Sequence, residues 1–182
     1  MKNVESCVRK CRSVISEIYS PPRVTHAAEF LPQLDLDPGV AWNLLMDQKP
    51  ILLIGSPPCT LFSIWQRLNR HKSQWAYKRR LREARIHLNF VCELYMAQLQ
   101  QGRLFLHEHP AGASSWQERL IRQVMRQEGV ESVLTDQCQF NQATADGEPI
   151  KKPTQWMSNC KEVLQALDRR CTGRGGVCSR TN

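Results

Sequence analysis

The chain has 182 residues, of which 41% are hydrophobic, so it can bury one substantial core but is short for two independent domains. Its 25 lysines and arginines outnumber 17 acidic residues, and the formal net charge of +8 favours a polyanionic partner without naming it. No stretch approaches the roughly 20 apolar residues that a membrane-spanning helix needs. The N-terminus also lacks the apolar core of a signal peptide, so we expect an intracellular protein with no membrane partner.

The eight cysteines are scattered over expected helices, strands and loops in a chain too large to need disulfide staples. Cys160, Cys171 and Cys178 form no Cys-x-x-Cys pair, and His107 and His109 have no obvious third ligand. We therefore expect reduced, structural thiols and predict no metal site.

The N-terminal third of the chain has the weakest patterns. Residues 1–22 mix charges with apolar residues and are expected to form a helical segment that ends at Pro21 and Pro22. A short helix at 24–30 is plausible, and residues 34–39 predict a turn. Residues 50–55 are continuously apolar and end in glycine and prolines, which is typical of a strand buried on both faces of a parallel sheet.

The remaining elements follow in alternation. Apolar residues from Leu81 to Tyr95 recur every three or four positions and predict a long helix that Gly102 ends. Further strands are expected at 104–106, 130–135 and around 155–157. Two helices are expected between and after them, the first capped by Ser115 and Glu118, the second by Asn159 and Glu162.

Strand and helix alternation predicts an open α/β sheet in a single domain, residues 1–182, with a glycine-rich flexible tail at 171–182. Ligands of such sheets bind beyond the carboxyl ends of the strands. Cys59 follows the first of these strands and Glu108 lies at the end of the next. We therefore expect both side chains to face one cavity.

A cysteine directly after two prolines lies on a stiff loop, where backbone amides or cations can stabilise the reactive thiolate. The alternative is a buried cysteine that closes a strand, as most free cysteines are. For Glu108 the alternative is a solvated carboxylate at a strand end.

Three motifs resemble those of one enzyme family. The run Gly55-Ser-Pro-Pro-Cys-Thr-Leu-Phe-Ser63 resembles the Pro-Cys nucleophile loop of DNA cytosine-C5 methyltransferases. Phe-Leu-His-Glu-His-Pro at 105–110 is similar to their Glu-Asn-Val or Glu-Asn-Pro motif, with His109 in place of asparagine. Residues 136–140 and 152–159 resemble a Cys-x-Phe then Lys-Pro-Thr pattern of phage and mobile-element relatives.

The resemblance implies a Rossmann-like, mostly parallel sheet with flanking helices, either complete or truncated, in a domain that methylates C5 of cytosine in DNA. Cys59 would attack C6 of the base, Glu108 would offset charge on the ring, and Pro58 would shape the loop. The base must leave the DNA stack to be reached.

The implied cofactor is S-adenosylmethionine. The family's glycine-rich turn has its nearest counterpart at 37–44, where Asn43 stands in the place of an acidic residue. The cofactor-binding residues expected from the resemblance are Gly39, Asn43, Ser56 and Pro57.

DNA contacts are expected beside the catalytic loop and in the Lys-Pro-Thr segment. The basic run 78–85 could grip phosphates, or it could be a solvated helix face. The candidate DNA-binding residues are Thr60, Ser63, Arg67, Arg79, Arg80, Lys152 and Thr154.

Two further functions stay open. One is a degenerate, catalytically inactive methyltransferase-like domain from a mobile element that binds nucleic acid through its basic surface. The other is a hydrolase that pairs Cys59 with His107 or His109.

Overall fold

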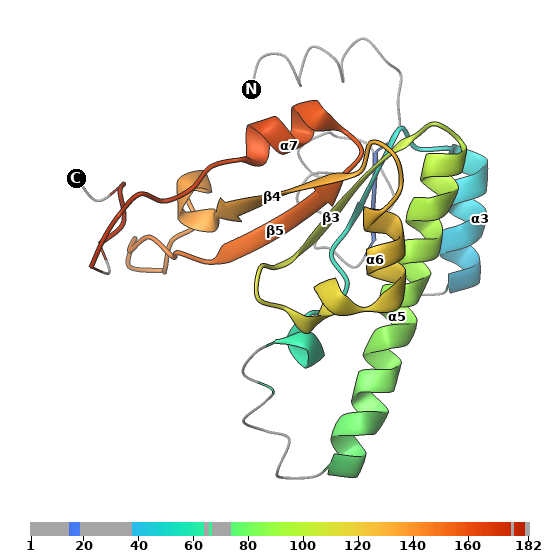
Figure 1. The fold of residues 1–182 in the computed structure, drawn as a ribbon, viewed down its shortest axis with the longest axis horizontal. Coiled ribbons are helices and arrows are strands. Elements are labelled where there is room, and N and C mark those ends of the chain that lie inside the picture. The colour runs from blue at the N-terminus through green and yellow to red at the C-terminus, as the bar shows by residue number, and fades with distance from the viewer. Residues whose placement is uncertain (1–14, 19–37, 64–65, 67–73, 176, 181–182) are drawn as a thin grey trace.

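A computed structural model describes residues 15–18, 38–63, 66, 74–175 and 177–180 of the chain (Figure 1). Five strands of this part form one sheet in the order β1-β2-β3-β5-β4. The strands are β1 (Ile15–Ile18), β2 (Leu52–Gly55), β3 (Leu104–Pro110), β4 (Glu131–Asp136) and β5 (Pro153–Ser158).

The sheet is mixed. Strands β1, β2 and β3 run parallel to one another, whereas β5 is antiparallel to both of its neighbours, β3 and β4. The predicted open α/β fold is thus confirmed, but the expectation of a mostly parallel sheet is wrong. The reason is the link between β4 and β5, which holds only the short 3-10 helix η3 (Gln137–Phe140) and a loop. Without a crossover helix, the chain returns antiparallel.

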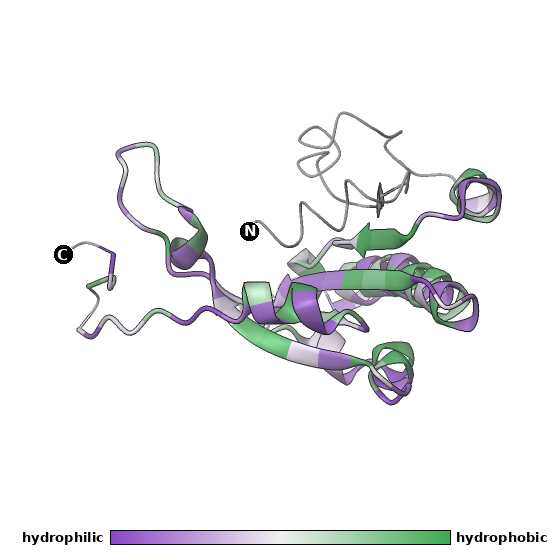
Figure 2. Cartoon of the chain, turned by 90° about the horizontal axis from the view of Figure 1, so that it is seen from above, coloured by the Kyte–Doolittle hydropathy of each residue, from purple (hydrophilic) through white to green (hydrophobic). Residues whose placement is uncertain are grey.

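Helices cover both faces of the sheet. The helices α3 (Pro38–Gln48), α5 (Gln74–Gln100) and α6 (Arg119–Met125) contribute to the larger core, together with strand residues such as Leu53 and Phe105. On the other face, α7 (Lys161–Leu167) packs against a smaller cluster around Ile54 and Leu106. Figure 2 shows hydrophobic stretches along the strands, with helices of mixed hydropathy around them.

The long helix and its end were predicted correctly. Ala84, Leu88, Val91 and Tyr95 form the buried stripe of α5. Gly102 follows the helix with φ of +66°, a left-handed conformation that glycine adopts without strain. No helix in the part of the chain that the structure describes has the length and apolar character to cross a membrane.

The helical N-terminal segment is wrong at its described residues, because Ile15–Ile18 form β1 beside β2. The helical periodicity of the sequence does not decide the structure here, because pairing with β2 buries this segment. Ser16 and Ile18 are both 1% exposed. The helix expected at 24–30 lies outside the described residues.

Both predicted helix caps are also wrong. Cys160, not Asn159, occupies the cap position before α7. The Asn159 side-chain amide instead accepts from the Phe105 backbone N–H at 3.0 Å and donates to the Arg103 carbonyl at 2.9 Å. Ser115 lies inside the 3-10 helix η2 (Ser114–Gln117), and α6 begins after Glu118 with no side-chain cap. In both cases a polar side chain near a helix start serves a tertiary contact.

Candidate functional site

The carboxyl ends of β2 and β3 lie side by side. Gly55, the last residue of β2, is in register with His107 of β3, so Glu108 lies one residue beyond it. We call the edge of the sheet where β2, β3 and β4 end and β5 begins the carboxyl-end edge. Cys59 reaches it through the loop after β2 and begins the 3-10 helix η1 (Thr60–Phe62). Its side chain is half-buried, not enclosed in the core.

His109 joins the two strand ends. Its Nε2 lies 2.8 Å from the Pro57 carbonyl oxygen and its Nδ1 lies 2.5 Å from the Ser115 hydroxyl. The carbonyl can only accept, so Nε2 carries the proton and Nδ1 accepts from the hydroxyl of Ser115. Burial lowers the pKa of His109 to about 4, although the Pro57 hydrogen bond opposes this, so the ring is neutral at pH 7. The proline loop before Cys59 is therefore held by an uncharged, fully paired imidazole.

His107 supports the end of β2, just before the proline loop, through Tyr95. Its Nδ1 lies 3.1 Å from the Tyr95 hydroxyl, which donates to the Gly55 carbonyl at 3.3 Å. Tyr95 also stacks on Phe105 with ring centroids 4.5 Å apart. Burial and the neighbouring His109 lower the pKa of His107, so this ring is neutral too. Its buried Nε2 has no hydrogen-bond partner.

Glu108 points to the other face of β3. It alternates with the buried histidines and shares its face with Leu106, which packs towards α7. Its Oε1 lies 3.9 Å from the Lys152 ammonium nitrogen, and this buried oxygen accepts no hydrogen bond. Lys152 directly precedes β5, whose first residue Pro153 pairs with Asp136 at the end of β4. A carboxylate thus lies beside a cation at the carboxyl-end edge, on the face of β3 opposite His109, and the cavity expected to join Glu108 with Cys59 stays a prediction.

The hydrolase alternative fails on this geometry. Both ring nitrogens of His109 are engaged, by Pro57 and Ser115, and His107 is fully buried with Nδ1 on Tyr95. Neither imidazole is hydrogen-bonded to Cys59, as a cysteine nucleophile and its base would require.

The predicted cofactor residues fall in two places. Ser56 and Pro57 lie at the carboxyl-end edge, where the Ser56 amide donates to the Ile18 carbonyl of β1 at 3.1 Å. Gly39 and Asn43 are exposed residues of α3. Gly39 was expected at a glycine-rich turn and Asn43 at a strand end. Both expectations are wrong, because residues 38–48 form the helix α3.

The predicted DNA-binding residues have different surroundings. Thr60, Arg79 and Arg80 are exposed, and Arg79 lies over the Trp75 ring and 3.9 Å from Glu83. Figure 1 shows the N-terminal end of α5, which carries both arginines, projecting beyond the sheet. Ser63 is half-buried after η1.

Two of these residues need separate treatment. Thr154 is fully buried, and its hydroxyl accepts from Gln137 at 2.9 Å and donates to the Lys152 carbonyl at 3.3 Å, so the predicted phosphate contact is wrong. An inward position on β5 explains this, since alternate strand residues face the core. Arg67 lies outside the described residues.

Sequence reasoning missed the supporting residues of this site. Tyr95 was predicted only as part of a hydrophobic stripe, and Ser115 only as a helix cap. One signal could have indicated these contacts: a tyrosine and two strand histidines at buried positions need hydrogen-bond partners for their polar atoms. Their partners come from 12 and 6 residues away along the chain, as well as from Pro57, which no local pattern identifies.

No family model matches the chain, and a search of curated proteins returns no significant relative.

Proposed function

We propose that the chain is a methyltransferase-like domain that acts on C5 of cytosine in DNA, with Cys59 as nucleophile and Glu108 as its carboxyl partner. One observation carries the proposal most. β2 ends opposite His107, one residue before Glu108, and the His109–Pro57 hydrogen bond joins the proline loop to β3. A nucleophile and an acid that serve one ring need such a common support.

The reaction assigns a separate task to each side chain. Cytosine C5 is a poor nucleophile until a group adds at C6, so the Cys59 thiolate forms a bond to C6. The pair of electrons moves into the ring, and Glu108 holds N3 and the exocyclic amine to offset the charge. After C5 has gained the methyl group it loses its proton, and the Cys59 sulfur leaves C6 with the bonding pair.

Several features suit these tasks. The Cys59 side chain is half-buried, so a flipped base can reach it, and the Glu108 Oε1 has no competing hydrogen bond. Exposed Arg79 and Arg80 on the projecting end of α5 supply positive charge for the DNA backbone.

S-adenosylmethionine would supply the methyl group. Ser56 and Pro57 fit a cofactor at the carboxyl-end edge, where open α/β sheets bind ligands. Gly39 and Asn43 do not fit, because both lie in a helix. Cofactor binding would therefore depend on Ser56 and Pro57.

The test is covalent trapping on DNA that contains 5-fluorocytosine, with S-adenosylmethionine present. Fluorine at C5 cannot leave as the proton does, so an active enzyme stays attached to the base through Cys59. We expect a denaturation-resistant adduct, its loss in Cys59→Ser, and its retention in Cys160→Ser, a matched control because both cysteines are half-buried. Glu108→Gln should slow trapping about 100- to 1000-fold.

A second measurement distinguishes an inactive domain. If no adduct forms with the cofactor but DNA binding persists, falls steeply with salt and is unchanged by Cys59→Ala, the chain is a non-catalytic nucleic-acid-binding domain. Calorimetric titration with S-adenosylmethionine alone then reports whether the cofactor pocket exists.

A further inference from the structure

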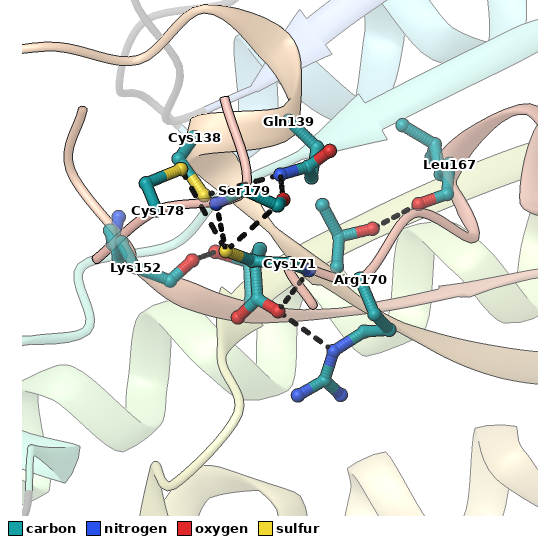
Figure 3. Close-up of polar contacts among 11 residues, drawn as sticks. Cys138, Gln139, Lys152, Leu167, Arg170, Cys171, Cys178 and Ser179 are labelled. Carbon is teal, nitrogen blue, oxygen red and sulfur yellow. Dashed lines mark hydrogen bonds and ion pairs between the residues drawn. The ribbon is translucent and has the colours of Figure 1, made fainter. Parts of the chain in front are cut away.

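Three cysteines from distant parts of the chain meet at the far end of the carboxyl-end edge. Cys138 lies in η3, directly after β4, while Cys171 and Cys178 lie in the C-terminal segment. Their sulfur atoms all lie within 4.8 Å of one another, and the three residues form a buried cluster of their own (Figure 3). We call these residues the cysteine cluster.

We propose that the cysteine cluster binds a zinc ion through three thiolates. The sulfur atoms of Cys171 and Cys178 are 3.7 Å apart. Tetrahedral zinc with bonds of about 2.3 Å places its sulfur ligands about 3.8 Å from each other. Soft thiolates prefer zinc over hard cations such as magnesium or calcium. The three sulfurs would occupy three corners of a tetrahedron, and water the fourth.

A disulfide explains the cluster less well. The bond would need the Cys171 and Cys178 sulfurs at about 2.05 Å, well inside their separation here. A Cys171–Cys178 disulfide would also leave the Cys138 thiol unexplained, although Cys138 is 0% exposed and adjoins both other cysteines. A metal ion accounts for all three residues.

Neighbouring groups stabilise negative charge on the Cys171 sulfur, whereas burial raises the pKa of the Cys138 thiol to about 11. The Ser179 backbone N–H and hydroxyl both donate to the Cys171 sulfur, at 3.5 and 3.6 Å. Gln139 donates to the Cys138 sulfur at 3.7 Å, and the Arg180 guanidinium lies on the Cys138 carbonyl at 2.6 Å. Such donors to sulfur favour the thiolate, the form that binds metal.

The backbone around the cluster is built for this approach. The buried Asp136 carboxylate accepts from the Cys171 N–H and from Arg170, both at 2.9 Å, and so fixes the start of the segment. At Gly173 an added Cβ would collide with the backbone of Val177 and Cys178, because the loop folds tightly back on itself. The turn returns Cys178 to Cys171, whereas the sequence alone predicted a flexible tail.

Zinc at this place would support the edge that carries Glu108. Gln137 directly precedes Cys138, and its backbone N–H donates to the Lys152 carbonyl at 3.1 Å. Lys152 is the cation beside Glu108. Binding converts three thiols to thiolates and releases their protons. The ion would hold the C-terminal segment against the end of β4.

The test is the zinc content of the 182-residue chain purified under reducing conditions, measured by elemental mass spectrometry. We expect one zinc ion per chain, its loss in Cys138→Ser, Cys171→Ser and Cys178→Ser, and its retention in Cys160→Ser. Replacing zinc by cobalt(II) should give the intense visible bands of a tetrahedral thiolate site.

Alkylation of the folded wild-type chain gives a second measurement, which does not require any cysteine variant to fold. Zinc should protect Cys138, Cys171 and Cys178 from iodoacetamide, and a chelator should remove that protection while Cys160 reacts in both conditions. The proposal is overturned if the reduced chain carries no zinc and gives no tetrahedral cobalt spectrum. A Cys171–Cys178 disulfide that persists under reducing purification, or equal zinc loss in Cys160→Ser, would also overturn it.

Discussion

The two halves of the carboxyl-end edge are held in different ways. At the ends of β2 and β3, neutral buried rings do the work: His109 bonds the proline loop, and His107 and Tyr95 lie beneath it. The end of β4 is held instead by the charged Asp136 carboxylate and by the cysteine cluster.

The difference affects what each half tolerates. A neutral imidazole in a buried site resists protonation, so the β2–β3 half should be sensitive to acid. Burial would raise the pKa of Asp136, but the Cys171 amide and Arg170 outweigh it and lower the pKa below its ordinary value. That half keeps its charge until far more acidic pH, and is sensitive to oxidants and chelators instead.

The largest expected effect is acid destabilisation of the β2–β3 half. The folded pKa of His109 is about 4, against 6.5 for an ordinary histidine. Below pH 6.5 the unfolded chain takes up a proton that the folded chain refuses, so stability falls as pH drops towards 4 and is level above 6.5. We expect His109 alone to contribute a loss of about 2 kcal/mol in the free energy of unfolding between pH 7 and pH 5, with a further loss from His107, measured by urea denaturation.

A matched pair of variants isolates the source of this slope. His109→Asn removes one of the two titrating rings and should reduce the slope by the His109 share, with lower stability at pH 7. His87→Asn, in a half-buried histidine of α5, keeps the His109 network and should leave the slope in place. An unchanged slope in His109→Asn would contradict the assignment.

A comparable effect is expected from filling the space between Gly55 and Tyr95, before the proline loop. In Gly55→Ala the new Cβ would overlap the Tyr95 hydroxyl and lie 3.0 Å from its ring carbon Cζ and 3.1 Å from Val91 Cγ1. Because Tyr95 is fully buried, it cannot move aside, and we expect the free energy of unfolding to fall by about 1–3 kcal/mol. Thermal and urea unfolding measure this.

Two comparisons sharpen that result. Adding Tyr95→Phe to Gly55→Ala removes the closest contact and should restore part of the stability. Gly173→Ala, in the other half, should displace the C-terminal segment with a global cost below about 1 kcal/mol, because that segment can detach locally. Equal costs for the two glycines would remove the distinction between the halves.

The smallest expected effect concerns the ion pair that links the halves. Lys152 is 47% exposed and its ammonium is 3.9 Å from Glu108, so solvent screens most of the attraction. Lys152→Met should change the free energy of unfolding by less than about 1 kcal/mol. A larger loss in urea unfolding would mean that the pair is a main support of the edge.

Much of the fold could be predicted because the relevant signals are local. The continuous apolar run of β2, the stripe of α5 and the turn at Gly102 each depend on residues near one another in the chain. The positions of Cys59 and Glu108 at adjacent strand ends followed from that pattern and the rule for parallel sheets.

The parts that were missed depend on distant partners. Nothing near Ser115 shows that its hydroxyl will meet His109, and nothing near Asn159 shows that it will bridge the backbone of β3. Cys138 lies 33 residues before Cys171, so no metal-binding spacing was visible. The reversed strand β5 was missed because periodicity reports which faces are buried but not which way a strand runs.

The position of β5 also has a consequence for synthesis of the chain. This strand is the last of the five in sequence, yet it lies between β3 and β4. While residues 153–158 are still inside the ribosome, the β3 edge and all of β4 await their hydrogen-bond partner, and open strand edges invite wrong pairing. Closure of the sheet is therefore a late event that waits for residues 153–158 to emerge, and nascent chains truncated before Pro153 should bind chaperones most strongly.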